Sequence, residues 1–402
     1  MKTPPGIWKK YRFLSVSLLV ICFLGSPLGQ LYAQKTILKT YSIGKVPLPY
    51  TFRTITSKCI TKAEAWKWRD DNQGSKKWRP QGICGVCVDS DGKVDRDGSL
   101  SCFEKVRSST ASSTGDTPYL LVSWYDSDAE KKGAKISVVN LDNNTYRNVL
   151  LVNQNYKDYE SMHAGGITAI NGKLHVGDSR NDTIRVFDLD EILYLNEDIN
   201  THYYYVLMEE FNYPVPLKPS TLSYDASQDL ILIGKYKPSS KSGVPFCWIS
   251  PPKTATEAET SETDYGAKIF RIPDKYKKLQ GIASKVIADI DGGKKIELYV
   301  AQSYGDYDGT PFKPSGYKQS TVSKLVITID QNTEYDKIIR NKLTYGTPIQ
   351  PDTSASIKFK QKCGDGVESI FLTDYGLWTL TEFADTRKVL LFKNPSSIWP
   401  TE

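Results

Sequence analysis

Polar residues with catalytic or ligand-binding chemistry stand at the starts and ends of short apolar runs in this sequence. Five of them begin a run or directly precede it: Gln81, His163, Ser220, Gln280 and Glu368. Four others end the run that follows: Asp126, Asp178, Gln302 and Glu382. The set combines carboxylates, amides and an imidazole, which hold cations, move protons or bind polar ligands. We expect these residues to line one channel if equivalent runs converge in space.

His163 and Glu368 are the two candidate catalytic residues of this set. Carboxylate and amide oxygens suit a hard divalent cation such as calcium, which could polarise a lactone or ester while His163 acts as the general base. The competing interpretation is that these residues only form hydrogen bonds with one another and with ordered water around a buried channel. We favour the second interpretation, because a histidine beside glycines is more often a hydrogen-bonded turn residue. The sequence leaves the identity of any metal unknown.

Cysteine usage points to an oxidising compartment. Beyond residue 33 the chain has an even number of cysteines, which favours disulfides. They are Cys59, Cys84, Cys87, Cys102, Cys247 and Cys363. The clustering of the first four predicts two local bridges, which leaves Cys247 to pair with Cys363. A zinc site built on the C-x-x-C at 84–87 is the alternative, but no second C-x-x-C pair completes it.

The acidic segment 89–98 is a second candidate cation site. Its residues DSDGKVDRDG offer many oxygen ligands. However, Lys93 occupies a ligand position of a calcium loop, and no glutamate stands where the bidentate ligand belongs. We therefore expect a solvated hairpin loop.

Trp66, Trp68 and Trp78 lie in a lysine-rich stretch. Exposed tryptophans near polar groups are one means of stacking on a carbohydrate. Large aromatic side chains are more often buried in a core or between sheets, and we expect that outcome here.

Short β-rich runs separated by turn residues would position the polar residues. One cycle contains a run at 166–170, an Asn171-Gly172 hairpin signal and a run at 173–177. Each cycle has an entry strand, a tight turn, a strand that ends in polar residues and an outer strand, with a period of about 45 to 60 residues, as in a propeller blade. The sequence therefore predicts an all-β fold, namely a β-propeller with six blades, or with seven as the alternative. Helical periodicity is limited to a turn or two at 189–195.

No linker divides the chain, so we expect a single domain over residues 34–402, with a cysteine-rich insertion at about 57–105. A propeller closes by pairing a strand from one terminus with the blade built from the other, because an open ring leaves an unpaired edge. The strand-like run at 36–41 is therefore predicted to join the blade at 367–392.

Residues 1–33 have the order of basic, apolar and small residues that is typical of a cleaved secretory signal. The apolar run of about 13 residues is shorter than the roughly 20 that span a bilayer. Without this segment, 48 basic residues face 46 acidic ones, and nothing resembles the positive stripe that binds nucleic acid. We expect a secreted or periplasmic monomer with at most peripheral membrane contact.

Six short segments occur in order along residues 80–392. They are Pro80-Gln-Gly82, residues 120–126, His163-Ala-Gly-Gly166, residues 175–179 together with 185–188, Gln280-Gly281 and residues 377–382. Together they resemble a group of bacterial secreted proteins of unassigned activity that are predicted to be β-propellers. The resemblance implies export and a propeller fold, and it transfers no catalytic residue. The cysteine cluster and segment 89–98 are additions in this chain.

The sequence lacks a specific nucleophile motif, a phosphate loop and a complete metal motif. This favours a ligand-binding or interaction protein whose ligand is a small molecule, a glycan or another protein. The alternative is a hydrolase or lyase of lactonase type at the channel mouth, with or without a metal, in which His163 and Glu368 act.

Overall fold

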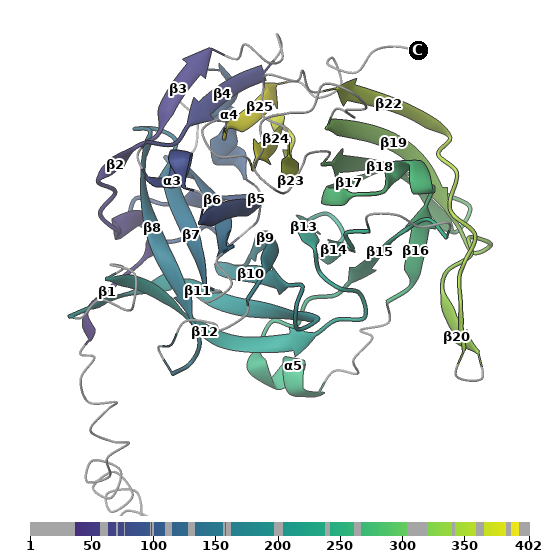
Figure 1. The fold of residues 1–402 in the computed structure, drawn as a ribbon, viewed down its shortest axis with the longest axis horizontal. Coiled ribbons are helices and arrows are strands. Elements are labelled where there is room, and N and C mark those ends of the chain that lie inside the picture. Colours follow the sequence, from purple (N-terminus) through teal and green to yellow (C-terminus); the bar gives the residue numbers. More distant parts are fainter. Residues whose placement is uncertain are drawn as a thin grey trace, which may run out of the picture.

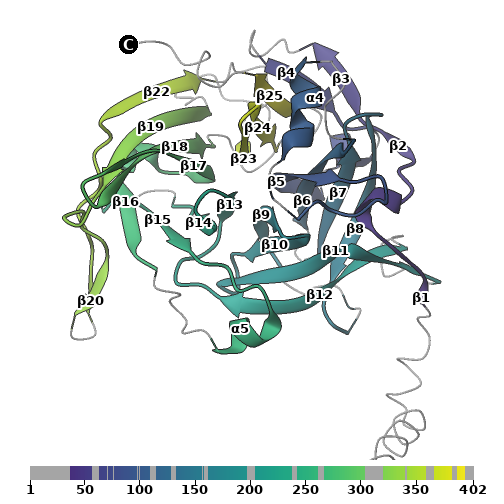
Figure 2. The ribbon, with the colours of Figure 1, turned by 180° about the vertical axis from the view of Figure 1, so that it is seen from behind.

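The computed structural model describes residues 37–393, apart from positions 57–62, 70, 76, 97, 99, 109–114, 128–132, 156, 158–161, 197–203, 238–241, 261–266, 304–319, 340–341, 359–365 and 383–386. These residues form mostly β-strands, so the prediction of an all-β protein is confirmed. The strands group into sheets that stand around a common centre (Figure 1), and the opposite view shows the same arrangement (Figure 2). No helix among the described residues is long and apolar enough to cross a membrane.

Each sheet begins near the centre and continues outward as an antiparallel set of strands. Sheet 1 contains β5 (Trp78–Val88), β6 (Thr117–Asp126), β7 (Ala134–Asn140) and β8 (Thr145–Val152). Sheet 2 contains β9 (Ala164–Ile170), β10 (Lys173–Asp178), β11 (Thr183–Leu195) and β12 (Tyr205–Pro214). Sheet 3 contains β13 (Thr221–Asp225), β14 (Leu230–Gly234), β15 (Val244–Ile249) and β16 (Ile269–Ile272). A parallel pairing of β8 with β12 joins sheets 1 and 2.

Two further sheets complete the circle. Sheet 4 contains β17 (Leu279–Ile290), β18 (Gly293–Gln302), β19 (Thr321–Ile329) and β22 (Thr353–Lys358). Sheet 5 contains β23 (Val367–Thr373), β24 (Gly376–Thr381), β25 (Val389–Lys393), β4 (Ala63–Lys67) and β3 (Arg53–Thr56). The described residues thus hold five such sets of strands, and the predicted number of six blades, with seven as the alternative, stays a prediction. The N-terminal strands β3 and β4 join sheet 5 instead of forming a sheet of their own.

The remaining elements are short. The strands are β1 (Ile37–Tyr41), β2 (Tyr50–Thr51), β20 (Lys337–Ile339) and β21 (Lys342–Thr344). The helical segments are η1 (Ile43–Lys45), α3 (Asp71–Gly74), η2 (Ser101–Phe103), α4 (Glu104–Ser108), α5 (Ala255–Thr260) and η3 (Asp274–Tyr276). The helical turn expected at 189–195 is wrong, because these residues extend β11 and pair with β1 and β12.

The first strands of the five sheets lie side by side around the centre, in the order β5, β9, β13, β17, β23 and back to β5. Their approach leaves no room for a side chain at some positions. A Cβ atom on Gly166 would lie 2.2 Å from the main-chain nitrogen of Leu222, and one on Gly281 would lie 2.6 Å from the main-chain oxygen of Glu368. Only glycine fits at such contacts between neighbouring strands.

Aromatic side chains fill the space between sheets 5 and 1. Trp66, Trp68 and Trp78 are all buried. The ring of Trp66 stacks on Trp378 with centroids 5.3 Å apart, and Trp68 packs on Phe52 at 4.7 Å. The prediction that these three tryptophans are packing residues is therefore confirmed, and they are not free to stack on a carbohydrate.

N-terminal strands close the circle, but they are not the predicted ones. β4 pairs with β25, with Trp66 opposite Val389, and β3 continues the sheet outward. The run at 36–41 was predicted to do this and does not, since β1 pairs with β11 in sheet 2. The physical reason is burial: β4 places Ala65 and Trp66 in the core, whereas most of β1 is exposed.

Proline substitutions distinguish these two strands. Ala65→Pro removes main-chain hydrogen bonds inside a strand that is paired on both sides. We therefore expect the free energy of unfolding to fall by at least about 3 kcal/mol. In Thr40→Pro the strand is paired on one side only, and we expect a loss of about 1 kcal/mol or less. Urea unfolding followed by tryptophan fluorescence measures both. A larger loss in Thr40→Pro would show that β1 closes the ring.

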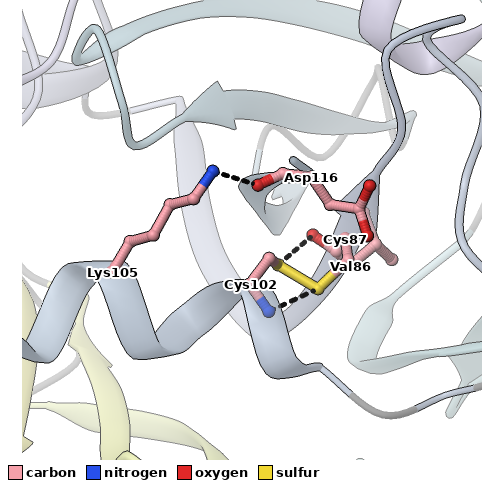
Figure 3. Close-up of a disulfide and its surroundings, with 5 residues drawn as sticks. All are labelled: Val86, Cys87, Cys102, Lys105 and Asp116. Atoms are coloured by element: carbon pink, nitrogen blue, oxygen red, sulfur yellow. Dashed lines mark hydrogen bonds between the residues drawn. A yellow bond between two sulfur atoms is a disulfide. The ribbon is translucent and has the colours of Figure 1, made fainter. Parts of the chain in front are cut away.

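A disulfide between Cys87 and Cys102 closes the insertion that lies between β5 and β6. Figure 3 shows that the bond joins the end of β5 to η2, where the main-chain N–H of Cys102 also donates to the Cys87 sulfur at 3.3 Å. The Lys105 ammonium donates to the main-chain oxygen of Asp116 at 2.5 Å. The insertion is thus fastened to sheet 1 at both of its ends.

The other predicted disulfides are partly wrong. Cys84 and Cys247 are buried free thiols, while Cys59 and Cys363 lie outside the described residues. Cys84 and Cys87 stand three residues apart on one strand, so their side chains point to opposite faces and only Cys87 meets η2. Cys247 lies in an interior strand of sheet 3, within an apolar cluster. With Cys87 in a disulfide, a zinc site on the C-x-x-C lacks one of its thiolates.

Thiol chemistry tests this assignment. Burial raises the pKa of Cys247 to about 12 and also raises the pKa of Cys84, so neither forms a thiolate readily in the folded protein. We expect a non-reducing digest to contain a Cys87–Cys102 peptide, and Cys84 and Cys247 to be alkylated only after unfolding. Replacing Cys87 and Cys102 by serine should cost about 3 kcal/mol, as expected for a loop of this length. Recovery of Cys84 or Cys247 in a disulfide would contradict the assignment.

Candidate functional site

One end of the central axis collects polar side chains. The first strand of every sheet begins there, and because the second strand runs antiparallel to it, the second strand ends there. Trp78 at the start of β5 stands opposite Asp126 at the end of β6, and Ala164 on β9 stands opposite Asp178 on β10. We call this the starting end, and the opposite one the finishing end.

Glu368 at the start of β23 is the centre of the polar cluster. Gln81 Nε2 donates to one of its carboxyl oxygens at 3.2 Å, and Gln280 Nε2 donates to the other at 3.4 Å. Glu382, which follows β24, is near enough for its charge to act on the Glu368 carboxyl group. The structure thus brings together four of the nine predicted residues, and they come from sheets 1, 4 and 5.

The pKa of the Glu368 carboxyl group lies well above that of an ordinary glutamate. Burial raises its pKa, since only 1% of the residue is exposed, and the neighbouring Glu382 carboxylate raises the pKa further. Arg79 and the hydrogen bond from Gln81 act in the opposite direction and are outweighed. A neutral carboxyl at this position can donate a hydrogen bond as well as accept one.

Two residues of the cluster were missed by the sequence analysis. Arg79 Nη1 donates to Glu382 Oε1 at 3.3 Å, and a quarter of the Arg79 side chain is exposed. Tyr125 stands opposite Arg79 in the pairing of β5 with β6, and burial raises the pKa of its hydroxyl. Arg79 could have been predicted from its position two residues before Gln81, because alternate residues of a strand share a face. Nothing comparable in the sequence distinguishes Tyr125.

His163 reaches the cluster through Tyr125, whose ring it meets edge to face with centroids 4.3 Å apart. Its Nδ1 lies 2.8 Å from the Ser179 hydroxyl, and its main-chain N–H donates to the Asp178 carboxylate at 3.4 Å. Burial lowers the pKa of His163 to about 4, and the positive charge of Arg180 adds to this effect. The imidazole is therefore uncharged at neutral pH and accepts a proton only weakly.

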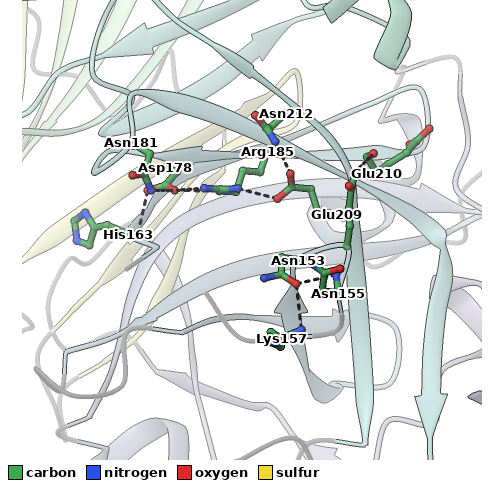
Figure 4. Close-up of polar contacts among 11 residues, drawn as sticks. Asn153, Asn155, Lys157, His163, Asp178, Asn181, Arg185, Glu209, Glu210 and Asn212 are labelled. Carbon is green, nitrogen blue, oxygen red and sulfur yellow. Dashed lines mark hydrogen bonds and ion pairs between the residues drawn. The ribbon is translucent and has the colours of Figure 1, made fainter. Parts of the chain in front are cut away.

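Asp178 belongs to a chain of ion pairs within sheet 2. Arg185 bridges the carboxylates of Asp178 and Glu209 at 3.0 and 2.8 Å, and the Asn212 amide donates to Glu209 at 2.6 Å. Figure 4 shows these side chains in a row, with His163 at one end of it. We infer that Asp178 positions the main chain at His163.

The other predicted residues make contacts within or beside their own sheets. Asp126 pairs with Lys77 at 3.2 Å. The Gln302 amide donates to two main-chain oxygens of the turn at 275–277, at 3.0 and 2.9 Å. The main-chain N–H of Ser220 donates to the carbonyl oxygen at the end of β14, at 3.0 Å. These contacts fix strand ends at the rim of the starting end.

Neither predicted cation site has its ligands assembled. Within the part of the chain that the structure describes, no group of three or more His, Cys, Asp or Glu side chains is placed to hold a metal ion. In segment 89–98 the Asp89 carboxylate accepts the main-chain N–H of Lys93 at 2.9 Å, and Val88 bridges Val94 across the turn. The hairpin interpretation of this segment is confirmed over its described residues.

Comparisons with known proteins assign no family: no family model and no curated protein matches the chain. Among solved structures, hydrazine synthase from Kuenenia stuttgartiensis is 9% identical, with 87% of this chain and 97% of that one covered and a TM-score of 0.32. An inactive virginiamycin B lyase from Staphylococcus aureus with quinupristin is 13% identical, with coverages of 82% and 99% and a TM-score of 0.30. A putative glycoside hydrolase from Bacteroides ovatus is 8% identical, with coverages of 91% and 99% and a TM-score of 0.30. Likenesses this weak carry no argument about activity.

The protonation of Glu368 has a measurable effect on stability. Its pKa is higher in the folded than in the unfolded chain, so its contribution to stability is complete below the unfolded value of about 4.3 and is lost as the pH rises toward the folded value. Glu368→Gln cannot ionise. We therefore expect its free energy of unfolding to rise relative to wild type between pH 4.5 and 8, by about 1.4 kcal/mol for each unit of the pKa difference.

Denaturant unfolding at several pH values makes this comparison. His163 acts in the opposite sense between pH 6.5 and 4, but both proteins carry it, so its effect cancels. Glu210→Gln is the matched control, because Glu210 is exposed and pairs with Lys173 outside the cluster. If the difference in the free energy of unfolding between wild type and Glu368→Gln stays constant with pH, Glu368 ionises normally.

Proposed function

We propose that this chain is a five-bladed β-propeller that binds a small, neutral, hydroxyl-bearing ligand, such as a sugar unit of a glycan, at the starting end. Four features support the propeller: the sheets are antiparallel, each has its first strand innermost, the sheets follow one another around an axis, and β4 closes the circle on β25. Each sheet then corresponds to one blade.

The observation that carries the ligand site is the convergence of side chains from separate sheets on Glu368. Gln81 and Gln280 contact it directly, and the charge of Glu382 acts on it. Arg79 and Tyr125 adjoin them and remain partly exposed. A few polar groups held in fixed positions are what a protein needs to orient a small ligand.

The charges of the cluster limit the ligand class. Arg79 is paired with Glu382, burial favours the neutral form of Glu368, and His163 with its pKa of about 4 is neutral near pH 7. The cluster therefore has little net charge with which to attract an anion or a cation. Its side chains offer both donors and acceptors, and a hydroxyl group can satisfy both. Sugars and other polyols meet this requirement.

Hydrolysis at His163 and Glu368 is the second candidate. The protonated Glu368 favours it, because a neutral carboxyl can act as an acid catalyst. One feature argues against it. His163, with a pKa of about 4, is a weak base at neutral pH.

Export is part of the proposal. Residues 1–33 resemble a secretory signal, and a disulfide such as Cys87–Cys102 persists in an oxidising compartment. We propose a secreted or periplasmic monomer whose partner is a glycan or another small molecule.

Ligand binding is tested with the purified chain from residue 34 onward on a glycan array, followed by calorimetry with the sugars that bind. Tyr125→Phe and Arg79→Met each remove hydrogen bonds at the exposed side of the cluster. We expect each to weaken binding about tenfold or more, because the ligand groups they contact are left unpaired.

Tyr299→Phe is the matched control, because the Tyr299 hydroxyl donates to Glu297 in sheet 4, away from the cluster. Its affinity should equal that of wild type. The proposal is wrong if wild type binds no glycan or polyol, or if binding survives both cluster substitutions. Hydrolysis of lactones, esters or glycosides that Glu368→Gln abolishes would establish the second candidate instead.

A further inference from the structure

A cavity of about 130 Å³ lies at the finishing end of the axis, opposite the polar cluster. The later residues of all five first strands contribute to its wall, as does the insertion between β5 and β6. The apolar part of the wall includes Ile83, Leu100, Ile167, Leu222 and Ile370. The cavity therefore differs in chemistry from the starting end and shares none of its polar residues.

Polar side chains also line the cavity, and four of them carry a hydroxyl group: Thr168, Ser223, Tyr224 and Ser284. The Tyr224 hydroxyl donates to Asp229 at 2.8 Å, and the Ser284 hydroxyl accepts from the Trp248 indole at 3.4 Å. Thr168 is only 5% exposed, and its hydroxyl has no hydrogen-bond partner among the described residues. The Thr168 oxygen is not among the fully buried side-chain atoms that lack a partner, so a molecule in the cavity can reach it. An occupant that carries a hydroxyl group can hydrogen-bond to Thr168.

The size and charge of the cavity define the occupant. Cavities of about 150 Å³ with apolar walls hold one benzene molecule, so this one suits a single six-membered ring. No lysine, arginine or histidine lines it, and Asp95 does, which disfavours an anion. The ring must carry a group that pairs with a hydroxyl.

The insertion covers this end of the axis. Val94 and Leu100 of the insertion form part of the cavity wall. Phe103 packs edge to face on Phe371 of β23, with centroids 5.5 Å apart, and the Cys87–Cys102 disulfide holds the insertion on β5. The cover is therefore bonded to sheet 1 and packed against sheet 5.

We propose that this cavity is a second binding site, for a neutral molecule the size of one six-membered ring that carries a single hydroxyl, with Thr168 as its hydrogen-bonding residue. A phenol or a cyclic alcohol has this chemistry. The site does not depend on the function proposed for the starting end.

Phenol, toluene and benzoate are the probes, titrated into the disulfide-bonded chain by calorimetry. We expect wild type to bind one phenol and no benzoate. Thr168→Val should weaken phenol about fivefold, the value of one neutral hydrogen bond, and leave toluene unchanged. Ser223→Leu fills the cavity and should abolish binding of both. Thr183→Val is the matched control, because it removes another buried hydroxyl that lacks a partner, outside the cavity.

Amide chemical-shift mapping on wild type keeps the test independent of whether the variants fold. Phenol should shift the amides of Thr168 and Ser223 and leave those of Gln81 and Glu368 in place. The proposal is overturned if wild type binds neither phenol nor toluene, if the shifts occur at the starting end, or if Thr168→Val weakens both probes equally.

Discussion

Close approach of the first strands at the central axis is the constraint on which the rest of the structure depends. At Gly166 and Gly281 the main chain of the next strand occupies the space that a side chain would need. Side chains cannot meet there, so the polar residues of the inner strands gather just before these contacts, where the strands begin. The same glycines follow His163 and Gln280 in the sequence, and this packing is the physical reason for that order.

Burial at the axis then sets the chemistry of the starting end. Removal of Glu368 from water favours its neutral form, and the amides of Gln81 and Gln280 hold its carboxyl in place. Neighbouring positions respond in the same way, because burial also keeps His163 uncharged. We propose that fixed donors and acceptors with little net charge favour a neutral polar ligand there. The cavity at the finishing end is lined by strand residues and by the disulfide-held insertion.

Local patterns in the sequence were enough to predict the strands and part of the polar cluster at the starting end. Alternation and hairpin signals identified the all-β fold, and the starts and ends of runs identified Gln81, Gln280, Glu368 and Glu382 as neighbours. What failed depends on contacts between distant segments. The pairing of β4 with β25 depends on which N-terminal strand can bury an apolar face there. The roles of Arg79 and Tyr125 depend on contacts between adjoining strands. Cysteine pairing failed at Cys84 because strand geometry, not sequence proximity, decides which sulfurs meet.

The protonation state of Glu368 is the property that connects the axis to the proposed site, and a direct titration measures it. In a chain labelled with carboxyl-¹³C glutamate, Glu368→Gln assigns the resonance by its disappearance. We predict that the Glu368 carboxyl stays protonated at pH 7 and titrates well above the usual glutamate value of about 4.3. A resonance that titrates near that usual value would contradict the account of the starting end as a neutral cluster.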